Sequence, residues 1–242
     1  MIGKMKKAIL IIVEGKSDKA ALEVVLRELY ITQTNIKFYV KNGDITSDKT
    51  TTEKNIIKRI QNIINEVIRD TKLKTIDFDK VILITDTDGC FVEDCLIKSN
   101  KSTVELIYSE TQIECKDVDE IIKRNQLKSG ILKYIVSEIP NNKICGIDFR
   151  CFYMLCNLEH VLYNEINVQD DMKIEKGYVF SKEYANKVFD FISLINEAAK
   201  EISDDYNESW NFIMNNNESL KRHTNFYIFF KNNPCGQYLY NI

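Results

Sequence analysis

Two short apolar runs in the N-terminal part of the chain each end abruptly in acidic residues and a glycine. Residues 9–15 are Ile-Leu-Ile-Ile-Val-Glu-Gly, and residues 81–89 are Val-Ile-Leu-Ile-Thr-Asp-Thr-Asp-Gly. A continuous apolar run of this length is typical of a strand buried on both faces of a parallel sheet. We therefore predict two such strands, which deliver Glu14, Asp86 and Asp88 to the carboxyl edge of the sheet.

The segment between these runs alternates between helical and extended periodicity. Residues 17–30, with Ser17 as N-cap, and a stretch from about residue 52 have the apolar spacing of sheet-covering helices, and residues 36–40 form an apolar strand that ends in a turn at 42–44. This order predicts an α/β fold with a parallel sheet, right-handed crossovers and ligands at the carboxyl ends of the strands. The predicted buried positions are Ala20, Ala21, Val24, Val25 and Leu29 in the first helix, and Ile56, Ile57, Ile60, Ile63, Ile64, Val67 and Ile68 in the second.

The rest of the chain is less regular. Its apolar pattern predicts a strand near residues 104–108, a helix over 118–137 and a fourth sheet strand over 143–153. From about residue 168 the pattern is mainly helical, and it closes in an aromatic stretch at 225–230 that favours a strand.

The length of 242 residues sets the domain organisation that we expect. It is enough for one sizeable core, or one core with a small appended subdomain, and only 2 Pro and 8 Gly leave no stretch with the composition of a linker. We expect an α/β domain over 1–165, with an insert at about 96–140, followed by a mainly helical C-terminal subdomain over 166–242.

Charge and cysteine content narrow the class of protein. The formal net charge of −3 gives no overall attraction to nucleic acid, so such binding would need a local basic patch. Seven cysteines without a C-x-x-C pair indicate reduced thiols rather than a zinc site or a disulfide framework. The first apolar run is too short to span a bilayer, and Glu14 follows it in place of a cleavage site. We expect a cytoplasmic protein without a membrane segment.

The three acidic residues predict a cation site if their strands are neighbours. Glu14, Asp86 and Asp88 would then meet at one sheet edge. Oxygen ligands of this kind suit a hard divalent cation, usually Mg²⁺, which keeps other positions for water and phosphate oxygens. The chemistry indicated is metal-dependent work on a phosphodiester.

The order of these strand ends also resembles a known family. The strand ends are Glu14-Gly15, Asn42-Gly43 and Asp86-Thr87-Asp88. Over about residues 8–95, this succession is similar to the Toprim domain of primases, topoisomerases, OLD-type nucleases and small RNA-maturation nucleases. The chain lacks the winged-helix and active-tyrosine regions of a topoisomerase, and it has no room for an OLD-type ATPase.

The resemblance implies a Toprim-like, Rossmann-like sheet and a nuclease that cleaves DNA or RNA with Mg²⁺ or Mn²⁺. It makes Glu14 a general acid or base that also touches the metal, and Asp86 and Asp88 the metal ligands. By analogy, it also implies an effector in bacterial phage defence that works with an ATPase or sensor protein. In OLD-type members a further acidic residue helps bind a second metal; Glu159 is the best match, and Glu93 and Asp94 compete for that role.

Two lysines are candidates for contact with nucleic acid. Lys16 follows the first strand, and Lys128 belongs to the predicted helix over 118–137. Lys128 could share a phosphate-contacting face with Lys123, Arg124 and Lys133, since such contacts supply most sequence-independent affinity. The alternative, which we favour for this face, is an ordinary solvated helix surface.

Three other known motifs share some of these residues. A P-loop ending in Gly15-Lys16-Ser17 would need glycine at the position of Leu10, and an EF-hand loop starting at Asp86 would need its glycine two residues later than Gly89. A haloacid-dehalogenase-type phosphatase would use Asp86 as nucleophile and Asp88 as its acid partner, but Cys90 stands at the expected threonine and that family places the motif on its first strand. A non-catalytic binding or regulatory module is the third hypothesis.

Overall fold

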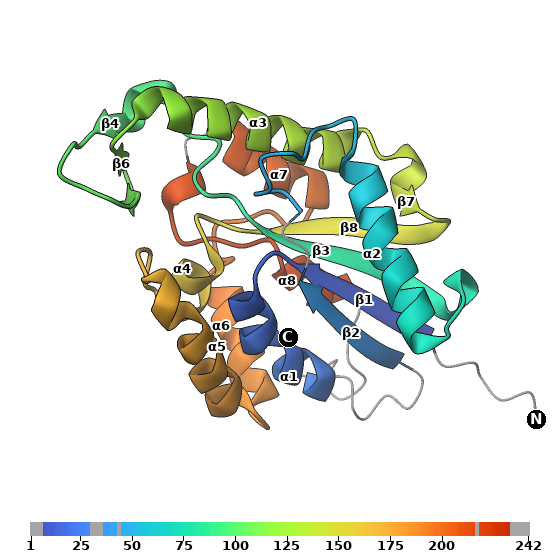
Figure 1. Ribbon diagram of the computed structural model, residues 1–242. Helices are drawn as coiled ribbons and strands as arrows, with labels where there is room; N and C mark the ends of the chain where they lie inside the picture. Colours follow the sequence, from blue (N-terminus) through green and yellow to red (C-terminus); the bar gives the residue numbers. More distant parts are fainter. Residues whose placement is uncertain (1–6, 30–35, 43–44, 216–217, 233–242) are drawn as a thin grey trace, which may run out of the picture.

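The computed structural model describes residues 7–29, 36–42, 45–215 and 218–232, and its centre is a five-stranded sheet (Figure 1). The strand order is β2-β1-β3-β8-β7, with neighbouring strands parallel except β7, which pairs antiparallel with β8. The fold is therefore α/β with a mostly parallel sheet, as the sequence predicts. The strands are β1 Lys7–Val13, β2 Ile36–Asn42, β3 Phe78–Asp86, β7 Lys143–Ile144 and β8 Ile147–Met154.

Helices cover both faces of the sheet because the central strands are apolar on both sides. In β1, Ile9 and Ile11 pack into one core cluster, whereas Leu10 and Ile12 pack into the other. The first cluster lies under α1 Lys16–Leu29, α4 Leu158–Tyr163, α5 Asp170–Tyr184, α6 Val188–Glu197 and α8 Tyr227–Asn232. The second lies under α2 Ile56–Thr71, α3 Val118–Ser137 and α7 Tyr206–Asn215. The part expected as a C-terminal subdomain thus contributes side chains to both clusters.

The strand order places a switch point at the end of β1. After β1 the chain forms β2 on one side, and later it returns to form β3 on the other side. Val13 is level with Ile84 in the pairing of β1 and β3, so Glu14 and Asp86 leave adjacent strands at nearly the same height. In open α/β sheets, ligands bind in the crevice outside such a switch point.

Helix α5 packs closely on α1, and a glycine makes this possible. A Cβ at Gly177 would lie 2.7 Å from the carbonyl oxygen of Ser17 and 3.2 Å from the backbone nitrogen of Ala21. Helix α1 begins one residue earlier than predicted, so Ser17 lies in its first turn and is not its N-cap. The prediction that Val24 is buried is wrong, because 42% of this side chain is exposed on the outer face of α1.

The insert combines a small sheet with the long helix α3. Strands β4 Ile97–Ser99, β6 Ile113–Cys115 and β5 Ile107–Tyr108 pair in that order, and α3 has the predicted bounds. The predicted strand over 104–108 is shorter than expected, since Val104 is 97% exposed and has no pairing partner to bury it. Short 3₁₀ helices are η1 Thr75–Asp77, η2 Asp94–Leu96, η3 Pro140–Asn142 and η4 Glu218–Leu220.

Two further predictions of strands need correction. The segment 143–153 is not one strand but the hairpin β7–β8, whose turn holds Cys145 at φ 53° and Gly146 at φ 77°. The aromatic stretch at 225–230 contains a helix, α8, in place of a strand. Its aromatic side chains are buried against other aromatic rings, Phe229 against Phe152 for example, so burial and not sheet pairing explains its composition.

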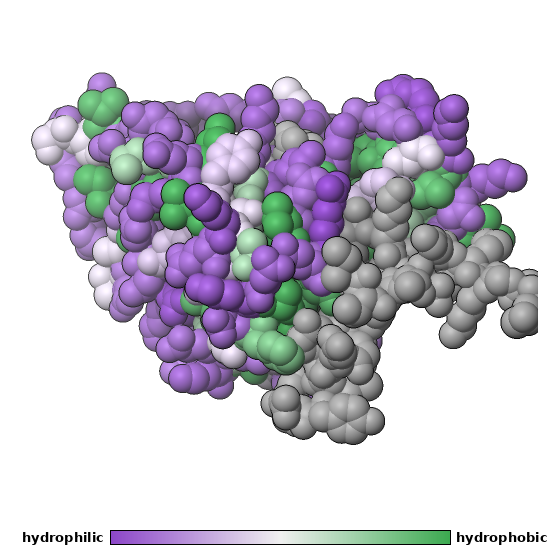
Figure 2. Space-filling view, turned by 90° about the horizontal axis from the view of Figure 1, so that it is seen from below, coloured by the Kyte–Doolittle hydropathy of each residue, from purple (hydrophilic) through white to green (hydrophobic). Residues whose placement is uncertain are grey.

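The surface drawn in Figure 2 is mostly hydrophilic outside the grey atoms, with apolar side chains in small separate groups. Among the described residues, no helix has both the length and the apolar character needed to cross a membrane.

Candidate active site at the carboxyl edge of the sheet

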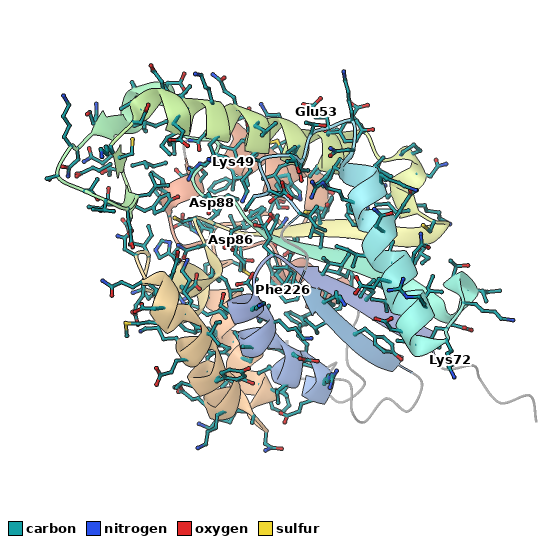
Figure 3. The ribbon with its side chains drawn as sticks, in the orientation of Figure 1. Lys49, Glu53, Lys72, Asp86, Asp88 and Phe226 are labelled. Carbon is teal, nitrogen blue, oxygen red and sulfur yellow. The ribbon has the colours of Figure 1, made fainter. Side chains whose placement is uncertain are left out.

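The structure brings the three predicted acidic residues together. Glu14, Asp86 and Asp88 line one open cavity of about 510 Å³ at the carboxyl edge of the sheet; Figure 3 shows the two aspartates close to each other there. The same cavity is lined by Gly15, Lys16, Ser17, Asp18, Ser47, Glu159 and Lys173. Five carboxylates therefore share one cavity with two lysines on its wall.

A tight turn fixes the position of Asp88. Asp88 has φ 50° and Gly89 has φ 65°, and the backbone N–H of Cys90 donates to the Thr87 carbonyl over 2.9 Å, as in a type I′ turn. A Cβ at Gly89 would lie 2.7 Å from Leu220 Cδ2, so only glycine fits there without rearrangement. The Asp-Gly pair is thus required by the backbone, and it aims the second aspartate at the cavity.

Glu14 is buried and held by three hydroxyl groups. Thr85 Oγ1 donates to Glu14 Oε1 over 2.6 Å, Ser47 Oγ donates to Oε2 over 2.8 Å, and Thr46 Oγ1 also donates to Oε1. Two of these donors come from the loop after β2 and one from β3. Sequence reasoning missed all three hydroxyls, because nothing in the local pattern shows that this loop reaches back to β1 or that Thr85 contacts Glu14.

Lys128 is the main correction to the sequence-based interpretation. It is only 3% exposed, and its Nζ lies 2.5 Å from Asp88 Oδ2, 3.4 Å from Glu14 Oε2 and 3.0 Å from Ser47 Oγ. The solvated-face interpretation is therefore wrong for Lys128, but it holds for Lys133, which is exposed and does not line the cavity. Burial alone would lower the pKa of Lys128, but the carboxylates of Asp88 and Glu14 raise it above its ordinary value. Lys128 is a buried cation shared by two of the predicted metal-binding residues.

The two aspartates have pKa values shifted in opposite directions. Burial, and then the negative charges of Asp18, Asp88, Glu159 and Glu14, raise the pKa of Asp86 well above its ordinary value. Burial acts in the same direction on Asp88, but the cations of Lys128 and Arg124 hold its pKa below the ordinary value. The cavity thus has unbalanced negative charge centred on Asp86.

Glu159 and Asp18 supply the remaining carboxylates. Glu159 lies in the first turn of α4, is 2% exposed, and has a pKa raised by burial in spite of the nearby Lys173. The competing candidates Glu93 and Asp94 are exposed and do not line the cavity.

Asp18 is an acidic residue that sequence reasoning did not assign to the site. It is 6% exposed, accepts a hydrogen bond from the backbone N–H of Gly15 over 2.8 Å, and has a pKa raised by burial. Asp18 lies in the first turn of α1, which begins two residues after Glu14, and this short connection was the signal that could have placed it beside the strand end.

The two lysines on the cavity wall are both accessible to solvent, and Lys173 also forms an ion pair. Lys16 is exposed at the start of α1. Lys173 of α5 has a side chain 30% exposed, and it pairs with Asp170 over 2.8 Å. Both therefore stand where the cavity meets solvent, whereas Lys128 lies beneath it.

The donor set fits a hard cation in chemistry, although the side chains would have to turn to bind one. Within the described residues, no three Asp, Glu, His or Cys side chains are arranged to hold a metal ion as they stand. Glu14 is oriented by hydroxyls and Asp88 by Lys128. Five carboxylates with a raised pKa at Asp86 nevertheless match the oxygen ligands that Mg²⁺ takes.

Comparisons of this chain with family models, with curated proteins and with solved structures find no match.

Proposed function

We propose that this protein is a Mg²⁺-dependent nuclease of Toprim type that hydrolyses phosphodiesters of DNA or RNA. The observation that supports this most is the gathering of five carboxylates in one cavity at the switch point of the sheet, with the pKa of Asp86 raised by burial and mutual repulsion. An accumulation of negative charge of this kind is stabilised by a cation, and perturbed carboxylates in a cleft mark functional sites more often than structural ones.

The residues divide into metal-holding and proton-handling groups. Asp86 and Asp88 would hold the Mg²⁺ or Mn²⁺ ion, with Glu159 and Asp18 in reach of the same cavity. The ion would polarise the scissile phosphate and offset charge developing on its oxygens. Glu14, fixed by three hydroxyl donors, is placed to accept a proton from water or to return one to the leaving oxygen.

Lys128 adds a permanent positive charge at the base of this group. Its Nζ contacts Asp88 and Glu14 together, so it keeps the two carboxylates close in the absence of another cation. A role as an effector in phage defence, with an ATPase or sensor partner, extends the proposal by fold-level analogy alone.

The test is cleavage of single-stranded DNA, double-stranded DNA and structured RNA with Mg²⁺ or Mn²⁺, for the wild type, Glu14→Gln and Asp86→Asn. We expect metal-dependent cleavage by the wild type and its loss in both variants, with unchanged circular dichroism. Lys133→Gln, an exposed change on α3 outside the cavity, is the control and should cleave like the wild type.

Other outcomes would point to the two alternatives. Phosphatase activity that is lost in Asp86→Asn but kept in Glu14→Gln, without nuclease activity, would favour the aspartyl-phosphate mechanism. Binding of Mg²⁺ without cleavage of any nucleic acid, alone or with partners, would favour a regulatory module.

A further inference from the structure

A second cavity adjoins the carboxylate cavity on the α3 side of Asp88. Its volume is about 280 Å³, and it shares Ser47 and Asp88 with the first cavity. Lys49, labelled in Figure 3, lies on its wall above Asp88. The lining residues are Thr46, Ser47, Asp48, Lys49, Asp88, Glu120, Lys123, Arg124, Leu127 and Lys128. We call this space the α3 cleft.

One stripe of α3 forms a wall of the α3 cleft. The helix contributes positions 120, 123, 124, 127 and 128, which is the i, i+3, i+4, i+7, i+8 spacing of a single helix face. Within the stripe, the cations extend from the exposed Lys123 to the buried Lys128. These two residues are roughly 7.5 Å apart along the helix axis at 1.5 Å per residue. The cationic side chains of α3 therefore extend from the solvent-exposed end of the cleft to Asp88.

The acidic residues of the α3 cleft are each matched by a cation. Asp48 pairs with Arg59 Nη1 over 2.8 Å, and Glu120 pairs with Lys49 over 3.2 Å. The third, Asp88, pairs with the buried lysine described above. The negative charge of the cleft wall is thus neutralised within the protein.

Two cations of the α3 cleft form no ion pair among the described residues, although the charge of Arg124 also acts on Asp88. Lys123 forms no ion pair in the part of the chain that the structure describes. Arg124 donates to neutral acceptors, namely Tyr108 Oη over 2.9 Å, the Asp88 carbonyl over 2.7 Å and the side-chain amide of Asn125. The α3 cleft is accordingly net positive, beside a cavity that is net negative.

We infer that the α3 cleft is a subsite for the phosphate next to the scissile one on a nucleic acid strand, with Lys123 and Arg124 as its cations. The inference rests on the proposed nuclease function. A strand whose scissile phosphate lies at the carboxylates must place a neighbouring phosphate within one nucleotide of them, and the α3 cleft is the adjoining space with unmatched positive charge. Lys and Arg contacts to phosphates supply affinity without reading sequence.

The experiment separates strand binding from chemistry at a single phosphodiester. Lys123→Glu is compared with Lys133→Glu, which reverses a charge on the same helix outside both cavities. A fluorescent single-stranded oligonucleotide measures binding by anisotropy over a range of salt, in an Asp86→Asn background that prevents cleavage. Hydrolysis of bis(4-nitrophenyl) phosphate with Mn²⁺, which has no second phosphate, measures the carboxylate site alone.

We expect Lys123→Glu to weaken oligonucleotide binding by about tenfold or more, and to reduce the slope of log K against log salt by about 0.7 per lost phosphate contact on a single strand. Its hydrolysis of the small diester should stay at the level of the wild type, and Lys133→Glu should match the wild type in both assays.

In the Asp86→Asn background, equal oligonucleotide affinity with and without Lys123→Glu, or equal losses from Lys123→Glu and Lys133→Glu, would overturn the subsite. Failure of the nuclease proposal is recognised differently. In that case the wild type hydrolyses neither the diester nor the oligonucleotide, whatever the anisotropy shows.

Discussion

Replacing Lys128 by Met tests whether the buried cation holds the site together. Met has a similar length and no charge, so the change leaves Glu14 and Asp88 facing each other without the shared ammonium group. Breaking a buried ion pair from one side costs about 3–5 kcal/mol, and we expect the lower end, because the Asp88 side chain is 27% exposed and water can reach it.

The assay is thermal unfolding at pH 7 with EDTA. A loss of about 3 kcal/mol corresponds to a fall in Tm of about 6–12 °C for a chain of this size. Lys133→Met, an exposed change on the same helix, should stay within about 0.5 kcal/mol of the wild type.

A double variant and a metal titration sharpen the result. Lys128→Met combined with Asp88→Asn should recover part of the lost stability, because the uncompensated carboxylate is removed as well. Mg²⁺ should raise the Tm of Lys128→Met more than that of the wild type, because the ion would replace the missing charge. A Tm of Lys128→Met within 1 °C of the wild type would refute the view that this lysine neutralises the site.

Three further predictions concern stability in the absence of metal. Asp86→Asn should be more stable than the wild type at pH 7. Because the pKa of Asp86 is raised, the folded state binds more protons than the unfolded state from about pH 4 upward, so the stability of the wild type falls as the pH rises through that window. Thermal melts at pH 4 and pH 7 should show that the difference in Tm between the variant and the wild type is smaller at pH 4. Gly89→Ala should lose about 1–3 kcal/mol in denaturant unfolding, because its φ is 65° and its Cβ would meet Leu220; a loss below 0.5 kcal/mol would contradict the turn geometry. Gly177→Ala should lose a similar amount, because the new methyl group would press on the backbone of α1, and equal stability would show that the two helices can separate freely.

The sequence was informative where the position of a site residue follows from strand order. Glu14, Asp86 and Asp88 could be placed together because each follows an apolar strand, and parallel neighbouring strands end at one edge of a sheet. The bounds of α3 were also predictable, since Asp117 caps its first turn by accepting from the Glu120 N–H.

The partners of these carboxylates could not be predicted in the same way. Lys128 is 40 residues from Asp88 and 114 from Glu14 along the chain, and a lysine in an amphipathic helix gives no local sign that it faces inward. Thr46 reaches Glu14 from 32 residues away. Such contacts depend on how the insert and the loop after β2 fold back over the sheet, and a single sequence carries no periodic signal for that.

The aromatic stretch at 225–230 shows a different limitation: here a local pattern was present but was assigned to the wrong type of element. Its composition reflects complete burial, which favours large side chains in a helix as much as in a strand. Phe226 and Phe229 stack with ring centroids 5.5 Å apart at 8°, so the segment is packed by its rings. Aromatic content alone therefore misassigned α8.

Hydrogen bonds connect the turn at Asp88 to segments of the chain that are synthesised later. The Asp88 N–H donates to the Cys156 carbonyl over 2.8 Å, and the Cys156 N–H donates to the Ser219 carbonyl over 3.2 Å. Residues 88, 156 and 219 leave the ribosome in that sequence, with the last emerging well after the first. A nascent chain that stops before residue 219 would carry every carboxylate of the cavity and still lack the Ser219 carbonyl that accepts from the Cys156 N–H. These hydrogen bonds are thereby complete only after residue 219 has been synthesised.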